Sequence, residues 1–288
     1  MDRVLIGVDG SLASQTVLRW ATSLARRRRV PVEVVHAWEY PADAVISIGR
    51  VTLPPADTAE SAVAASLASF VSDVLGGDDD DVTLTVKRGP AAAALLSAAR
   101  VGQPFVVVGS RGLGGFEGLR QGSVSRQVCE HATRPVTVVR EATPILPFRL
   151  GRIMAATDGS PPAERALAFA GQLAQDLEAE LLVVHAATHP AAMDPNDVEQ
   201  LESHGSLYHV VETWCEPLDE LGVPYEISVV DGDARTALLD QADISRADLI
   251  VVGSRGRGPL TSLLLGSVAA GLAQRSRVPL TIVPPERR

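Results

Sequence analysis

The sequence LIVVGSRGRGPLTSLLLGS, residues 249–267, places a short apolar run directly before a glycine-rich stretch. Two residues separate Gly253 from Gly256, nine separate Gly256 from Gly266, and a serine follows. The same spacing occurs 144 residues earlier (253 − 109) in FVVVGSRGLGGFEGLRQGS, residues 105–123. One glycine-rich stretch is a weak signal, but two copies between a strand-like and a helix-like run indicate a duplicated functional loop.

The physics of this loop suits an anionic ligand. Glycine lets backbone N–H groups approach a ligand and tolerates positive φ, and a helix N-terminus adds unpaired N–H donors and a positive dipole end. We expect Ser123 and Ser267 to be N-cap residues whose hydroxyls could instead face a phosphate. For a single copy, a tight strand-to-helix turn that needs glycine and a cap stays open as the alternative.

Apolar runs and helical periodicity alternate along the chain. Strands are predicted at 4–8, 32–38, 82–86, 105–108, 136–139, 153–157, 181–185, 225–230, 249–252 and 280–283. Helices are predicted at 14–28, 57–75, 90–101, 124–131, 161–177, 198–221, 234–246 and 267–276, and a proline-containing loop at 41–56. This alternation predicts an α/β fold, in which helices cover both faces of a parallel sheet.

The order of elements occurs twice. We therefore predict one domain over residues 1–141, a linker over 142–151 that contains Pro144 and Pro147, and a second domain over 152–288.

The net charge and composition of the chain restrict the kinds of partner that it can bind. The net charge of −9 and the pI of about 5.2 argue against nucleic acid or an anionic membrane. The basic run Arg26–Arg29 is read as the cationic last turn of a helix. Cys129 and Cys215 suggest no disulfide framework, and no apolar run reaches the roughly 18–20 residues of a membrane span. We expect a cytoplasmic protein.

The two glycine loops resemble the G-x2-G-x9-G-[ST] motif of nucleotide-binding members of the universal stress protein family. The family's early aspartate is present in both copies, in Val8-Asp9-Gly10-Ser11 and in Thr157-Asp158-Gly159-Ser160, 149 residues apart (158 − 9). The resemblance covers nearly the whole chain as two tandem domains.

The resemblance implies two doubly wound, open parallel sheets of the Rossmann-like, adenine nucleotide alpha hydrolase-like type, with strand order 3-2-1-4-5. That order puts a switch point between strands 1 and 4, where ligands bind at the carboxyl ends of the strands. The fifth strands, 136–139 and 280–283, are apolar and make poor exposed edges. We expect them to pair across a pseudo-twofold axis, as domains of the family do.

By resemblance, each repeat would bind ATP, or ADP or AMP, with Mg²⁺ held by the phosphates. Asp9 and Asp158, next to Gly10 and Gly159, would accept hydrogen bonds from the nucleoside. The backbone of Ala37 and Ala186 would reach the base edge. The phosphate-binding residues would be Gly109, Gly112, Gly122, Ser123, Val124 and Ser125 in repeat 1, and Gly253, Gly256, Gly266, Ser267 and Val268 in repeat 2. The alternative for Asp9 is a structural role, as an N-cap or as the turn residue of an Asp-Gly turn.

The copies are not identical. Repeat 2 has Arg257 where repeat 1 has Leu113, and Ala269 where repeat 1 has Ser125. Both sites look complete, but the sequence leaves open whether they bind equally.

Catalysis has little support. No G-x4-G-K-[ST] loop provides a phosphate-binding lysine, no Ser/His/Asp set stands out, and no metal site is predicted. His36 and His185 are expected to pack at strand ends. The leading hypothesis is a nucleotide-binding regulatory protein of the stress response that is not an enzyme. A slow ATPase and a nucleotide-independent oligomerisation module are the alternatives, and a homodimer and the protein partner stay open.

Overall fold

The computed structural model describes residues 1–39, 56–77, 79–112, 122–143, 148, 150–187, 207–257 and 264–286. The strands of the first half are β1 (Val4–Val8), β2 (Val32–Trp38), β3 (Val82–Arg88), β4 (Phe105–Gly109) and β5 (Val136–Val139). Those of the second half are β6 (Arg152–Ala156), β7 (Glu180–Ala187), β8 (Tyr225–Asp231), β9 (Leu249–Gly253) and β10 (Leu280–Val283).

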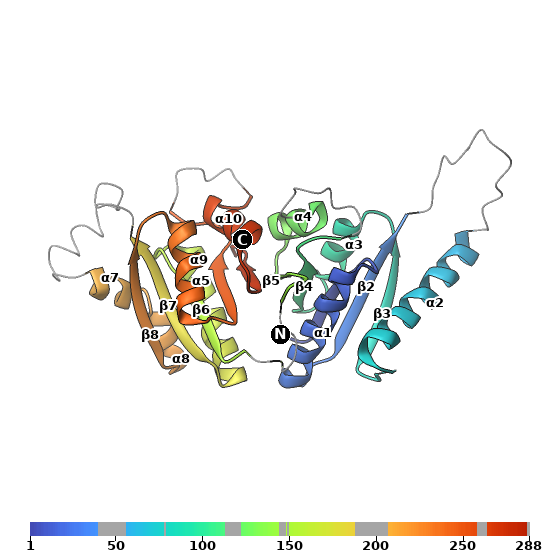
Figure 1. The fold of residues 1–288 in the computed structure, drawn as a ribbon, viewed down its shortest axis with the longest axis horizontal. Coiled ribbons are helices and arrows are strands. Elements are labelled where there is room, and N and C mark those ends of the chain that lie inside the picture. The colour runs from blue at the N-terminus through green and yellow to red at the C-terminus, as the bar shows by residue number, and fades with distance from the viewer. Residues whose placement is uncertain are drawn as a thin grey trace.

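The helices of the first half are α1 (Leu12–Arg28), α2 (Ala56–Leu75), α3 (Ala91–Ala98) and α4 (Ser123–His131). Those of the second half are α5 (Pro161–Leu177), α7 (Leu207–Thr213), α8 (Glu216–Leu221), α9 (Ala234–Ser245) and α10 (Ser267–Arg275). Strands and helices alternate as the sequence predicts (Figure 1).

The strands form one sheet with the order β3-β2-β1-β4-β5-β10-β9-β6-β7-β8. Pairing is parallel within each half, and both halves have the predicted order 3-2-1-4-5. The fold-class prediction is therefore confirmed. At the centre, β5 and β10 pair antiparallel, with Thr137 opposite Thr281, so the expected contact between the fifth strands is present.

Side chains of the sheet alternate between two apolar layers. Val4, Ile6 and Val8 of β1 point into the layer formed with α1, α2, α5, α7 and α8. Leu5 points into the opposite layer, with α3, α4, α9 and α10. The inner strands are thus buried on both faces, which explains their continuous apolar runs. The edge strands β3 and β8 are partly exposed.

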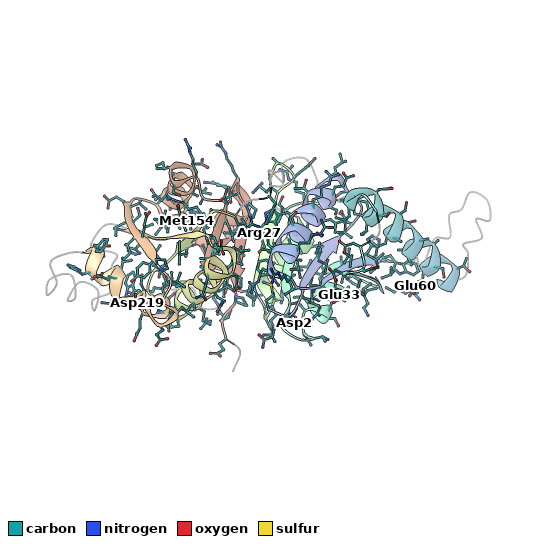
Figure 2. The ribbon with its side chains drawn as sticks, turned by 90° about the horizontal axis from the view of Figure 1, so that it is seen from below. Asp2, Arg27, Glu33, Glu60, Met154 and Asp219 are labelled. Atoms are coloured by element: carbon teal, nitrogen blue, oxygen red, sulfur yellow. The ribbon has the colours of Figure 1, made fainter. Side chains whose placement is uncertain are left out.

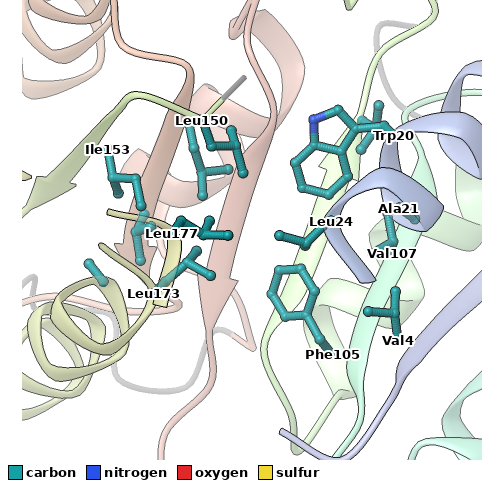
Figure 3. Packing of buried hydrophobic residues seen from close by; sticks show 14 of the residues in the cluster. Val4, Trp20, Ala21, Leu24, Phe105, Val107, Leu150, Ile153, Leu173 and Leu177 are labelled. Carbon is teal, nitrogen blue, oxygen red and sulfur yellow. The ribbon is translucent and has the colours of Figure 1, made fainter. Parts of the chain in front are cut away.

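One apolar layer continues across the boundary between the halves. Trp20 and Leu24 of α1 face Leu173 and Leu177 of α5 (Figure 3), and Phe105 stacks on Phe169 with ring centroids 5.7 Å apart. An ion pair between Arg28 and Asp176 lies beside this contact. The halves therefore share a hydrophobic core in addition to a sheet.

Charged side chains occupy the outer helices, as Figure 2 illustrates. Glu60 of α2 and Asp219 of α8 lie toward opposite ends of the molecule, while Met154 of β6 is buried within the second half. In the described ranges, no helix combines the length and the apolar character needed to cross a membrane.

Three predictions of element positions need comment. The predicted helix 198–221 is wrong in its described part, because it breaks at Trp214 and Cys215 between α7 and α8. Pro217 explains the break, since it lacks an N–H for Thr213 and its ring collides with that carbonyl in a continuous helix. The loop 41–56 lies outside the described residues except for Ala56, which begins α2. The domain boundaries 1–141, 142–151 and 152–288 stay predictions.

Candidate functional site

Each half contains a cavity at the carboxyl ends of its first and fourth strands, where the strand order reverses. The cavity of repeat 1 measures about 370 Å³, and that of repeat 2 about 430 Å³. They are lined by all the predicted binding residues except Gly10 and Gly159: Asp9, Ala37, Gly109, Gly112, Gly122, Ser123, Val124 and Ser125, and Asp158, Ala186, Gly253, Gly256, Gly266, Ser267 and Val268. The topology thus brings residues from distant segments to one crevice per repeat.

The aspartates are held firmly at the crevice. Asp9 Oδ1 accepts hydrogen bonds from Ser14 Oγ at 2.7 Å and from Ser11 N at 3.1 Å. Asp158 Oδ1 accepts from Ser160 N at 3.1 Å, and its Oδ2 accepts from Arg257 N at 2.9 Å. The Asp-Gly turn that the sequence offered as an alternative is present in both repeats, and the same carboxylates also line the cavities.

Gly112 and Gly256 let the aspartates lie against the glycine loops. A Cβ at Gly112 would lie 2.0 Å from Asp9 Oδ2, and one at Gly256 would lie 2.1 Å from Asp158 Oδ2. The glycines therefore allow the close approach of a carboxylate.

The loop glycines do not use the positive φ that glycine tolerates: Gly109, Gly112, Gly122, Gly253, Gly256 and Gly266 all lie outside that region. Positive φ occurs one residue after each aspartate instead, at Gly10 (83°) and Gly159 (69°). The turn, rather than the glycine loop, requires the left-handed conformation.

The helices that follow the loops begin without a capping side chain. The N-cap residues are Gly122 of α4 and Gly266 of α10, so the prediction that Ser123 and Ser267 are N-caps is wrong: they are the first helical residues. By contrast, Ser11, Ser160 and Asp233 cap α1, α5 and α9 with their side chains.

Backbone donors consequently remain available at the cavities. The first intrahelical hydrogen bonds run from Arg126 N to Gly122 O and from Ala270 N to Gly266 O. The N–H groups of 123–125 and 267–269 precede them and have no intrahelical partner. All six residues line the cavities. This arrangement suits an anion, because the donors coincide with the positive end of each helix dipole.

The sequence did not predict that each cavity has an apolar wall. Ala91 and Leu95 of α3 line the first cavity, and Ala234 and Leu238 of α9 line the second. These pairs are 143 residues apart (234 − 91 and 238 − 95), and this shared offset could have identified them.

Several polar residues were also missed as lining residues. Ser14 and Arg111 line the first cavity, and Thr157, Ser254, Arg255 and Arg257 line the second. The Ser254 hydroxyl is buried there and has no hydrogen-bond partner among the described residues. Ser14 stands at the fifth position after Asp9, and this local spacing was the available signal.

The strand ends complete the crevice. Ala37 and Ala186 lie near the carboxyl ends of β2 and β7. His36 Nδ1 is 2.9 Å from Val8 O, and His185 Nδ1 is 2.9 Å from Thr157 O. Both histidines pack at strand ends, as expected.

The two thiols are not poised for chemistry. Burial raises the pKa of Cys129 and of Cys215 to about 12, so both are neutral at physiological pH. Neither lines a cavity described above.

Within the described residues, no group of three or more His, Cys, Asp or Glu side chains is placed to hold a metal ion. The lining residues provide donors, acceptors and an apolar wall, which is an arrangement for binding.

Comparison with known proteins identifies relatives over nearly the full length. Residues 1–140 and 150–284 each match the model of the universal stress protein family. Universal stress protein Rv2005c of Mycobacterium tuberculosis is 30% identical over 97% of this chain and 96% of its own.

A solved structure that spans both halves has the same fold. A universal stress protein from Archaeoglobus fulgidus matches with a TM-score of 0.67 and 20% identity, covering 98% of this chain and 96% of its own. A universal stress protein solved in complex with cAMP matches 46% of this chain and 94% of its own, at 30% identity and a TM-score of 0.36.

Proposed function

Because the chain belongs to the universal stress protein family, we propose that each repeat binds an adenine nucleotide, as ATP, ADP or AMP. In this proposal the protein is a nucleotide-binding regulator of the stress response, and it performs no fast chemistry.

The observation that carries the proposal is the pairing of an uncapped helix start with a fixed carboxylate in one cavity. The N–H groups of 123–125 and 267–269 would bind phosphate oxygens. Asp9 and Asp158 are acceptors and would bind ribose hydroxyls.

The remaining walls suit an adenine ring. Leu95 and Leu238 provide apolar surface, and the backbone of Ala37 and Ala186 provides hydrogen-bonding groups at the strand ends. Volumes of about 370 and 430 Å³ fall in the range of roughly 300–1,000 Å³ typical of small-molecule sites. A bound Mg²⁺ would be held by the phosphates, because Asp9 and Asp158 are the only acidic residues among the described lining residues.

Two measurements test the proposal. Mass spectrometry of material released from heat-denatured protein identifies any nucleotide that copurifies. Calorimetric titration with Mg-ATP should give a stoichiometry near two, and titrations with ADP, AMP and cAMP rank the ligands. Absence of both heat and competition for every nucleotide would favour a nucleotide-independent interaction module.

The rate of ATP hydrolysis distinguishes the proposed function from the slow-ATPase alternative. No lysine or histidine occurs among the described lining residues of either cavity. We therefore expect hydrolysis far below ~1 s⁻¹, at the bottom of the ordinary enzyme range. Sustained turnover at or above that rate would show that the protein is an enzyme.

A further inference from the structure

Arg257 joins the two loops that face each other across the repeat-2 cavity. Its backbone N–H donates to Asp158 Oδ2 at 2.9 Å. Its side-chain Nη2 donates to Gly159 O at 3.2 Å. Its guanidinium carbon lies 4.9 Å from the centre of the Trp214 ring. One residue of the glycine loop therefore holds the Asp158–Gly159 turn by two hydrogen bonds and also lies over the Trp214 ring.

Trp214 is the platform for this arginine. It lies at the break between α7 and α8, and its ring covers Gly159 so closely that a Cβ there would be 2.3 Å from Trp214 Cε2. The His185 ring meets it edge to face at a centroid distance of 5.1 Å. The indole thus packs against the turn, the end of β7 and the glycine loop together. We call Arg257, Trp214 and Gly159 the repeat-2 clamp.

The described residues of repeat 1 contain no equivalent of this clamp. A Cβ at Gly10 would meet no atom within 4 Å. The residue at the position of Arg257 is Leu113 (257 − 144), whose side chain has neither charge nor hydrogen-bond donor. Phe70 is the only aromatic residue of α2, and it packs against the hydrophobic core. Asp9 accepts hydrogen bonds from Ser11 and Ser14, which are its neighbours in sequence.

We propose that Arg257 and Trp214 are positioning residues that fix Asp158 before a ligand arrives, and so make repeat 2 the tighter of the two nucleotide sites. This inference rests on the proposed function. A site whose groups are ordered in advance loses less conformational entropy on binding, so more of the contact energy appears as affinity. The guanidinium also brings a positive charge to a cavity whose ligand is an anion.

The test measures each site separately. Gly112→Val silences repeat 1 and leaves repeat 2 to be titrated with Mg-ATP, and Gly256→Val does the reverse. We expect the repeat-2 site to bind more tightly. In the Gly112→Val background, Arg257→Leu, which installs the residue of repeat 1, should weaken ATP binding roughly tenfold, equal to about 1.4 kcal/mol.

Further variants separate positioning from charge and from general damage. Arg257→Lys keeps the charge but loses the planar fork, so it should recover only part of the affinity. Trp214→Leu should weaken binding as Arg257→Leu does, and the double variant should be no worse than either single one, because the two residues act as a unit. Arg277→Leu, two residues beyond the C-terminal end of α10, is the matched control and should bind as the background does.

A ligand-free readout tests the clamp itself. Arg257→Leu should change the tryptophan emission without nucleotide, and a Trp214→Phe background should abolish that change. Equal affinity of the two sites, tighter binding by repeat 1, or unchanged ATP affinity in Arg257→Leu would overturn the inference while leaving the proposed function intact. No ATP binding in any background, with the emission change present, would overturn the proposed function and the affinity claim with it.

Discussion

Gly112 and Gly256 have a steric role that can be tested at a single atom. In each repeat the carboxylate of the early aspartate lies where a Cβ would be, 2.0 Å away in repeat 1 and 2.1 Å away in repeat 2. Any side chain at these positions must push the carboxylate out of the cavity.

We predict that Gly112→Ala and Gly256→Ala each weaken ATP binding at their own site. Loss of one hydrogen bond to a charged group costs about 1.5–3 kcal/mol, roughly 10–150-fold in affinity. Calorimetry checks the affinities, and circular dichroism checks that the fold is retained. The unaltered repeat is the internal control, and a variant that keeps wild-type affinity at both sites would refute the steric role.

At the same scale, the sequence identified the residues that line the cavities, but it did not explain why each of them is there. The spacing of the glycines and of Asp9 and Asp158 pointed to residues that do line two cavities. The contact of Gly112 with Asp9 was not predicted, because it spans 103 residues (112 − 9) and no local rule contains it. Trp214 was missed for the same reason, since only tertiary packing brings it to Gly159.

Among the elements, α4 and α10 begin at glycine where a capping side chain would ordinarily stand. Gly122 has the extended conformation of an N-cap, with φ −74° and ψ 157°. A Cβ there would make only ordinary contacts, the nearest at 3.5 Å. Steric crowding therefore does not explain why position 122 has glycine in place of a residue with a capping side chain.

We predict that Gly122→Asp and Gly122→Asn leave the protein as stable as before or slightly more so, and that both impair the repeat-1 site. Either side chain would accept hydrogen bonds from the first-turn N–H groups, for a gain of a few tenths of a kcal/mol over glycine. The aspartate also adds negative charge where a phosphate would bind, so it should reduce affinity more than asparagine does.

Thermal unfolding and calorimetry measure the two effects together. With Gly122→Asp, the stoichiometry for Mg-ATP should fall from two toward one, while the melting temperature is maintained. Two intact sites in this variant would mean that phosphates do not bind at the start of α4.

The sequence predicted the strands correctly from their apolar runs, but it did not predict the break between α7 and α8. Continuous apolar runs identified the inner strands, because these strands are buried between two helical layers. Pro217 marks this break in the sequence, but the helical pattern around it led to the prediction of one continuous helix. Periodicity therefore outweighed a breaker that should have ended the helix.

For the whole molecule, the strand order came from family resemblance, since periodicity alone does not order a sheet. The pairing of β5 with β10 was foreseeable, because two apolar, uncharged edge strands leave unpaired backbone groups. The shared core around Trp20, Leu24 and Leu177 was not foreseeable, because it depends on how the paired halves bring α1 and α5 together.

Thr137 and Thr281 lie opposite one another at the centre of the molecule, on β5 and β10. Both are fully buried, and their hydroxyl oxygens are 2.8 Å apart. Replacing one with valine leaves the other hydroxyl buried without its partner, which costs about 1–3 kcal/mol. Replacing both removes the polar pair with nearly the same shape, which is close to neutral.

We therefore predict that Thr137→Val and Thr281→Val each lower the free energy of unfolding, and that the double variant recovers most of the loss. Denaturant titrations of the four proteins give the coupling energy between the residues. Since the halves share one sheet and one apolar layer, the wild type should unfold in a single transition. Strictly additive losses in the double variant would show that the hydroxyl pair does not stabilise the junction, and two separate transitions would show that the repeats fold independently.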